Sequence, residues 1–374
     1  MQPASAAPGA WQARKTPGGS SAAGIPKRSP KPRAILHIGL EKTGTTSVQA
    51  FLALNRAALA ARGFRVPILV DPVFQHDLCL LAQDDEPAFA TLRAVTGTLD
   101  PGALAARRAA VAAALTAATT APGADEAIFL LSSEFAHSNL VTATEVARLA
   151  AVLGGWFASV RILVYLRRQD RLAISLLSSR LGGGEVLPPG ATLAEAIFPY
   201  EAATLPYYFN YAEILANYAA AFGPGALIVR EHARPRLIGG DVVADVCASC
   251  AIPPGGLLRE PAQNTAFTPA VLEMLAAVNP LLPPGPARDW LMALLVRDGT
   301  GAAGPLIGRA EAARILAVCA EANAALPDIL GQPFAFDGDL SSYPPEPPRP
   351  SPLDPAHAAI LAAMAREAVS VFAP

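Results

Sequence analysis

The stretch HIGLEKTGTTS at residues 37–47 decides how the rest of the chain is organised. It follows the apolar run AIL at 34–36, which predicts a buried parallel strand, and it precedes apolar residues that recur at helical spacing between 48 and 59. In a strand–turn–helix arrangement, glycines let the backbone approach a ligand, and the first N–H groups of the helix point toward an anion. The hydroxyl residues at 45–47 suit a helix N-terminus. The stretch therefore predicts an anion-binding loop.

The position of the lysine narrows the class of anion-binding loop. Gly39 and Gly44 have the separation of a Walker A loop, G-x-x-x-x-G-K-[ST], but Thr45 stands where that loop has lysine. The lysine of this stretch, Lys42, lies two residues before the second glycine. A dinucleotide fingerprint G-x-G-x-x-G is also absent, because Glu41 occupies its second glycine position. The loop is therefore of the phosphate type, but it is not that of an ordinary ATPase, kinase or dinucleotide enzyme.

The sequence Lys-Thr-Gly-Thr-Thr between a strand and a helix resembles the 5′-phosphosulfate loop of sulfotransferases that use 3′-phosphoadenosine-5′-phosphosulfate (PAPS). The stretch from 37 to 52 is similar to the start of a bacterial branch of that family, which has a P-loop-type fold. The resemblance implies a cofactor-binding role for Lys42, Thr43, Gly44, Thr45, Thr46 and Ser47, with Lys42 also catalytic. An incidental Gly-Thr turn before a helix is the alternative interpretation.

A second motif with the same resemblance begins where the apolar run 160–166 ends. Arg167 follows that run and Ser175 lies eight residues further on, in the order of the strand-Arg…Ser motif that holds the cofactor's 3′-phosphate in sulfotransferases. Arginine offers a planar fork of donors to a phosphate. The family pattern commonly has Asn-Pro after the arginine, whereas this chain has Arg168-Gln169. Asn264, in a loop resembling one near the nucleotide, and Arg259 are further candidates for the 3′-phosphate.

A base is needed to take the proton of an attacking hydroxyl. The apolar run 127–131 ends in Ser132-Ser133-Glu134, which places Glu134 at the end of a predicted strand. In several sulfotransferases a His or Glu base follows the corresponding strand, so the resemblance supports this position. We therefore predict Glu134 as the catalytic base, with His76 as the next candidate. Capping of the following helix, or pairing with an arginine, is the structural alternative for Glu134.

Apolar runs at 34–36, 64–66, 127–131, 160–166 and 226–230 alternate with helical patterns. This alternation predicts an α/β fold with a parallel sheet flanked by helices. Ligands of such sheets bind beyond the carboxyl ends of the strands, where the loop, Glu134 and Arg167 are expected. We predict a disordered tail at 1–32, a sulfotransferase-like α/β domain at 33–280, and a helical C-terminal extension at 281–374 that packs on the same domain.

Composition sets limits on partners. The 374-residue chain is 52% hydrophobic and 16% charged with a formal net charge of −2, so no general attraction to nucleic acid is expected. No run approaches the roughly 18 apolar residues of a membrane span.

Cys247 and Cys250 form a C-x-x-C motif, which could indicate a zinc or redox site. The motif lies in a helical pattern without a second ligand pair, so two buried small residues are the better explanation. No metal is expected, and four cysteines suit a reducing cytoplasm.

The resemblance as a whole predicts a cytoplasmic PAPS-dependent sulfotransferase that moves a sulfuryl group to a hydroxyl or amine. Carbohydrates, glycolipids and small molecules all remain possible acceptors, because the acceptor pocket would be built from the loops at 67–87 and 182–206. A divergent P-loop kinase, which would depend on magnesium, and a non-catalytic nucleotide or glycan binder are the alternatives. The sequence does not determine the oligomeric state.

Overall fold

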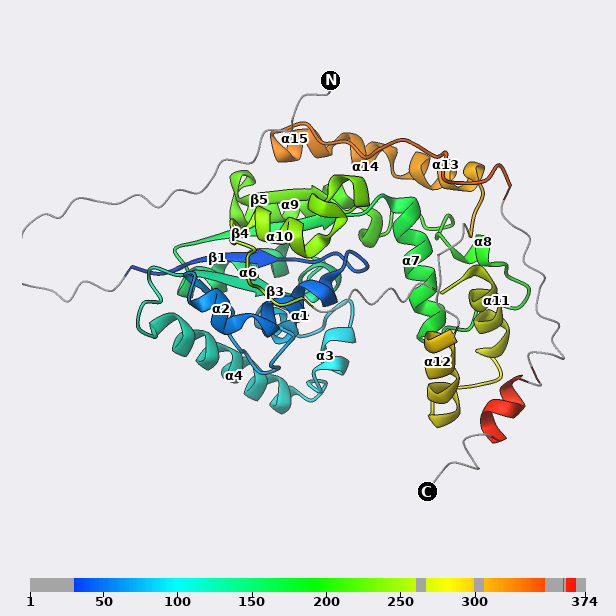
Figure 1. Ribbon diagram of the computed structural model, residues 1–374, viewed down its shortest axis with the longest axis horizontal. Helices are drawn as coiled ribbons and strands as arrows, with labels where there is room; N and C mark the ends of the chain where they lie inside the picture. Colours follow the sequence, from blue (N-terminus) through cyan, green and yellow to red (C-terminus); the bar gives the residue numbers. More distant parts are fainter. Residues whose placement is uncertain (1–29, 260–266, 299–305, 347–358, 360, 368–374) are drawn as a thin grey trace, which may run out of the picture. The chain divides into compact units, whose positions relative to one another are not determined.

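The computed structural model describes residues 30–259, 267–298, 306–346, 359 and 361–367 (Figure 1). The chain divides into two compact units that interleave along the sequence. The first unit combines Met1–Leu166, Ala212–Glu260 and Leu326–Phe334, and the second combines Arg167–Tyr211, Pro261–Ala325 and Ala335–Pro374. The predicted tail falls almost wholly outside the described residues, and the predicted division of the chain at 32/33 and 280/281 stays a prediction.

The first unit is built on a five-stranded sheet in which every strand pairing is parallel. Its strands are β1 (Arg33–His37), β2 (Phe64–Arg65), β3 (Ile128–Ser132), β4 (Ser159–Leu166) and β5 (Leu227–Glu231), in the spatial order β2-β3-β1-β4-β5. The central strand β1 therefore lies between β3 and β4, with His37 opposite Ser132 and Leu163. The predicted α/β class with a parallel sheet flanked by helices is confirmed.

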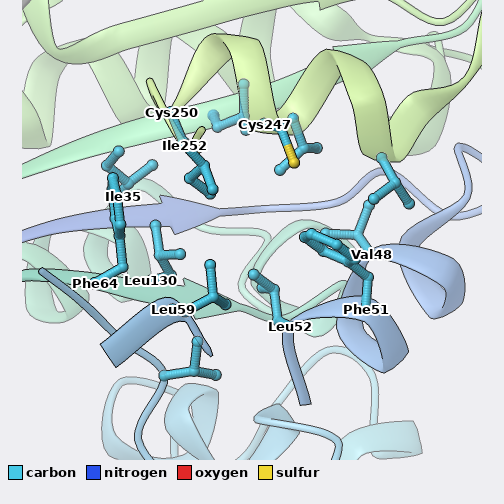
Figure 2. Close-up of a cluster of buried hydrophobic side chains, with 14 of the residues drawn as sticks. Ile35, Val48, Phe51, Leu52, Leu59, Phe64, Leu130, Cys247, Cys250 and Ile252 are labelled. Carbon is cyan, nitrogen blue, oxygen red and sulfur yellow. The ribbon is translucent and has the colours of Figure 1, made fainter. Parts of the chain in front are cut away.

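One face of the sheet is covered by helices α1 (Thr45–Leu54), α2 (Arg56–Ala60) and α10 (Val242–Ser249). Figure 2 shows side chains of α1 and α10 meeting the strand residues Ile35 and Leu130 in one cluster. Cys247 of α10 and Cys250, which directly follows this helix, belong to this cluster, and both are buried free thiols. The prediction that this C-x-x-C packs as a pair of small apolar residues is confirmed.

The break between α1 and α2 comes from a tertiary contact. The apolar spacing predicted one helix through Leu59, but the helix is interrupted at Asn55. The side chain of Asn55 accepts a hydrogen bond from the Leu258 backbone N–H at 2.8 Å and donates to the Leu258 carbonyl at 3.0 Å. Asn55 thus fixes a distant backbone segment instead of continuing the helix.

The other elements of the first unit complete its layers. Helix α6 (Ala143–Trp156) packs on β4 and begins with a capping box formed by Thr142 and Glu145. The remaining elements are η1 (His76–Leu81), α3 (Thr91–Val95), α4 (Pro101–Thr120), α5 (Phe135–Ser138), α9 (Tyr211–Phe222), η3 (Pro224–Ala226), η4 (Arg234–Arg236), η5 (Ile238–Gly240) and α15 (Leu326–Leu330). His76, the second candidate for the base, is the first residue of the 3₁₀ helix η1.

The second unit consists of helices and loops in the part of the chain that the structure describes. They are α7 (Gln169–Gly182), α8 (Leu193–Ala196), η2 (Tyr207–Phe209), α11 (Pro269–Val278), α12 (Pro286–Asp298), α13 (Arg309–Val318) and α14 (Ala320–Ala324). Helix α7 packs against α11 and α13. Thr268 caps α11 and Pro269 occupies its first turn. The sequence also predicts a final helix from Asp354 to about Val371, and that segment lies largely outside the described residues.

Candidate functional site

The loop between β1 and α1 follows the central strand at its carboxyl end. Gly44 adopts a left-handed conformation with φ 81°, and a Cβ at this position would lie 2.8 Å from a methyl carbon of Val242 in α10. Glycine is therefore required here both for its backbone angle and for its small size. Lys42 also has a positive φ, 67°, which is uncommon for a residue with a side chain. Backbone strain of this kind is concentrated at functional sites, so the conformation of Lys42 supports a ligand-binding role.

The loop and the first turn of α1 carry both buried and exposed hydroxyl groups. Thr43 is buried and donates a 2.6 Å hydrogen bond to the Leu40 carbonyl, so its hydroxyl stabilises the turn of the loop itself. Lys42, Thr46 and Ser47 are exposed. Gly44 holds the N-cap position of α1 and has no side chain to cap the helix. The first N–H groups of α1 thus lack the side-chain acceptor that an N-cap serine would provide, which suits an anionic ligand.

Thr45, the first residue of α1, is buried and packs against Gly39. A Cβ on Gly39 would overlap the Thr45 methyl group and would lie 3.1 Å from Cε1 of His37. The Thr45 hydroxyl donates a 2.6 Å hydrogen bond to Oε2 of Glu134. The loop and the predicted base, 89 residues apart in sequence, are therefore in direct contact.

Glu134 lies just beyond β3, at the same edge of the sheet as the loop, as the sequence predicted. It precedes α5, but its side chain does not cap that helix. No ion pair of Glu134 is found within the described ranges. Helix capping and pairing with an arginine, the two structural alternatives for Glu134, are therefore both absent among the described residues. Its side chain instead accepts the hydrogen bond from Thr45.

His76, the alternative base, lies in an aromatic cluster close to Glu134. Phe74 stacks on its ring with centroids 5.1 Å apart, and Phe135 meets it edge-on at 4.6 Å. Burial lowers the pKa of His76, and the negative charge of Glu134 opposes that shift. The structure therefore brings together three residues that the sequence predicted for the site: Thr45, Glu134 and His76.

A buried polar network supports the end of β1 behind the loop. Nδ1 of His37 lies 2.9 Å from the Ser132 hydroxyl, and burial lowers the pKa of His37 to about 4. Gln75 accepts a hydrogen bond from the Ser132 N–H, while Gln49 donates weakly, at 3.4 Å, to the Ser132 carbonyl. His37 is thus a packed, neutral histidine and not a surface acid or base.

His232 lies near the loop and is not among the residues that the sequence predicted for the site. It follows β5, and its backbone N–H donates to the Leu166 carbonyl at 2.7 Å. Its Nε2 lies 3.9 Å from the position that a Cβ on Gly44 would occupy. The useful signal was its place directly after a predicted strand, where ligand-binding residues of parallel sheets gather.

The residues predicted to hold the 3′-phosphate are divided between the two units: Arg167 and Ser175 belong to the second and Arg259 to the first. Arg167 follows β4 directly, its carbonyl accepts a 2.5 Å hydrogen bond from the Tyr211 hydroxyl, and burial lowers the pKa of its guanidinium. Ser175 is half-buried in α7. Asn264 lies outside the described residues. Arg259, in the first unit, forms an ion pair with Asp241.

Arg168 occupies one of the positions where the chain departs from the family pattern, and it has a structural role. Its guanidinium pairs with Asp170 at 2.8 Å, and both side chains are buried. It also donates to the carbonyls of Asp337 and Asp339, at 2.6 and 2.8 Å. Arg168 therefore ties the start of α7 to a C-terminal segment of the same unit, a contact that the sequence did not predict.

Among the described residues, no group of three or more His, Cys, Asp or Glu side chains is arranged to hold a metal ion. No helix in the described ranges combines the length and the apolar character needed to cross a bilayer.

The protein has an α/β fold in which a five-stranded parallel sheet carries a strained, glycine-containing loop after its central strand. No protein-family model matches the sequence, and neither does any curated protein. Among solved structures, a sulfotransferase from Alicyclobacillus acidocaldarius is similar to this chain with a TM-score of 0.42 and 14% sequence identity, over 82% of this chain and 97% of that one. A likeness this distant does not define an activity, so the loop and the residues around it are what point to a function.

Proposed function

We propose that this protein is a cytoplasmic PAPS-dependent sulfotransferase that transfers a sulfuryl group to a hydroxyl or amine of an acceptor. The observation that supports it most is the contact between the Lys-Thr-Gly-Thr-Thr loop and Glu134, through the 2.6 Å hydrogen bond from Thr45. An anion-binding loop and a carboxylate lie at one sheet edge, which is the pair of groups that sulfuryl transfer needs. Four buried free thiols are consistent with a reducing compartment.

The loop residues fit the 5′-phosphosulfate end of such a cofactor. Gly44 leaves the start of α1 uncapped, and exposed Thr46 and Ser47 lie in its first turn. Lys42 is exposed in the strained part of the loop, where an ammonium group would stabilise negative charge that develops on the leaving phosphate oxygen. PAPS, when bound, would supply the sulfuryl group. Arg167 and Ser175 are proposed to bind its 3′-phosphate, a role that rests on the resemblance of their motif.

Glu134 is proposed to accept the proton of the acceptor nucleophile. A carboxylate held by one hydrogen bond on Oε2 keeps Oε1 available for a second interaction. His76 is the alternative base, because burial lowers the pKa of its ring and so favours the neutral form that can accept a proton. Carbohydrates, glycolipids and small molecules remain the proposed acceptor classes.

The test has a binding step and a turnover step. Calorimetry of the full chain should show binding of adenosine 3′,5′-bisphosphate (PAP), and a mass-spectrometric screen of cell extracts with PAPS should show a product that has gained sulfate. Glu134→Gln should keep PAP affinity while turnover falls by about 10²–10⁴. Turnover within a few-fold of wild type at saturating acceptor would move the base assignment to His76.

Magnesium dependence distinguishes this proposal from the kinase alternative. The same screen run with ATP and Mg²⁺ should give no phosphorylated product. A product that has gained phosphate, together with weak PAP binding, would replace the sulfotransferase proposal with a P-loop kinase. Tight PAP binding without turnover of any extract component would favour a nucleotide-binding protein that lacks catalysis.

A further inference from the structure

The orientation of the Thr45 side chain is set by its packing. Its methyl group fills the space that a side chain on residue 39 would need, so the glycine there admits it. Thr45 is also almost fully buried, at 3% exposure. Threonine in a helix has few χ1 rotamers, so fixing the methyl group also fixes the direction of the hydroxyl. In this orientation the hydroxyl donates to Oε2 of Glu134 at 2.6 Å.

We infer that Thr45 is a positioning residue for Glu134, and that its hydroxyl holds this carboxylate when a nucleotide is bound. The inference rests on the proposed function, in which Glu134 is the base. It separates two roles within the loop. The buried hydroxyl of Thr45 serves the carboxylate, whereas the exposed hydroxyls of Thr46 and Ser47 remain available to the anion.

The chemistry of the hydroxyl group supports this separation. A threonine hydroxyl has one proton to donate, so a proton directed at Glu134 is not directed at a phosphate oxygen. A short O–H···O⁻ bond to a carboxylate is among the stronger hydrogen bonds in proteins. Glutamate otherwise has several freely rotating bonds, and losing that freedom on each encounter with an acceptor would slow the reaction. One fixed donor therefore keeps the carboxylate near the loop, where the nucleophile must approach.

The direct test is a crystal structure of the full chain with PAP bound. The hydrogen bond between Thr45 and Glu134 is expected to persist, with Thr46 or Ser47 contacting the phosphate. A Thr45 hydroxyl that instead contacts the phosphate, or that contacts neither group, overturns the inference. Failure of wild-type protein to bind PAP would contradict the proposed function itself, which keeps the two failures distinguishable.

Matched valine variants provide the test in solution. Thr45→Val keeps the buried methyl shape but removes the hydroxyl, so PAP affinity by calorimetry should stay within about threefold of wild type while kcat falls by about tenfold or more. Thr46→Val should weaken PAP binding by about tenfold, the scale of one charge-assisted hydrogen bond. Thr45→Ser, which keeps the hydroxyl, should retain most of the turnover. If Thr45→Val weakens PAP binding as strongly as Thr46→Val does, Thr45 acts on the cofactor.

A double-mutant cycle separates positioning from a general structural effect. In a Glu134→Gln background, Thr45→Val should cause no further loss of turnover, because the group that it positions is already disabled. Two losses that multiply independently would show that Thr45 acts through something other than Glu134.

Discussion

Substituting Gly39 by alanine tests the packing on which the loop depends. The added Cβ would overlap the Thr45 methyl carbon and would lie 3.1 Å from Cε1 of His37. Both neighbours are buried, so neither can turn into solvent. Overpacking of a buried site typically lowers the free energy of unfolding by about 1–3 kcal/mol. We therefore expect Gly39→Ala to lose about that much stability and to displace Thr45 from Glu134.

The control and the rescue come from the same chain. Gly155 lies in α6 with no atom within 4 Å of a Cβ built there, so Gly155→Ala should be neutral or stabilising by up to about 1 kcal/mol. Adding Thr45→Ser to Gly39→Ala removes the overlapping methyl group and should recover part of the loss. Urea denaturation followed by circular dichroism measures all four proteins. A Gly39→Ala protein as stable as wild type, or a double variant no better than the single one, refutes the packing argument.

Three further predictions address charge and protonation. Lys42→Ala should reduce turnover by about 10² or more because a preorganised donor to the leaving phosphate is lost. The control Lys31→Ala, outside the loop, should keep wild-type turnover. Equal turnover in both variants would remove Lys42 from that role. Arg167→Ala should weaken PAPS binding in calorimetry by about 1.5–3 kcal/mol but leave the analogue without the 3′-phosphate nearly unaffected; equal weakening would place Arg167 elsewhere. The folded-state pKa of His37 is about 4, below its ordinary value of 6.5. Between these two pH values the unfolded chain therefore binds a proton at His37 that the folded chain does not bind. The contribution of His37 to stability is lost as pH falls from about 6.5 to about 4. Between pH 6 and 4.5 the unfolding free energy of His37→Asn should therefore depend on pH less steeply than that of wild type, by about 1 kcal/mol per pH unit, and parallel curves would argue against a buried neutral His37.

Much of the loop and of the sheet could be predicted from local sequence. The apolar run before residue 37, the two glycines and the helical spacing after residue 45 predicted β1, the loop and α1, because these features act over a few residues of backbone. The strand patterns likewise predicted where β3 and β4 end, and hence that Glu134 and Arg167 follow strands. Parallel pairing then followed from the alternation of strands with helices.

Long-range contacts decided what the sequence did not reveal. The bond between Thr45 and Glu134 joins residues 89 positions apart, so no local pattern records it. His232 lies near Gly44 because β5 pairs with β4, which pairs with β1. Asn55 ends α1 because its amide is matched to the backbone of Leu258. Helical spacing reports which side chains share a face, but hydrogen bonds between distant segments depend on sheet order and packing, which only the tertiary structure determines.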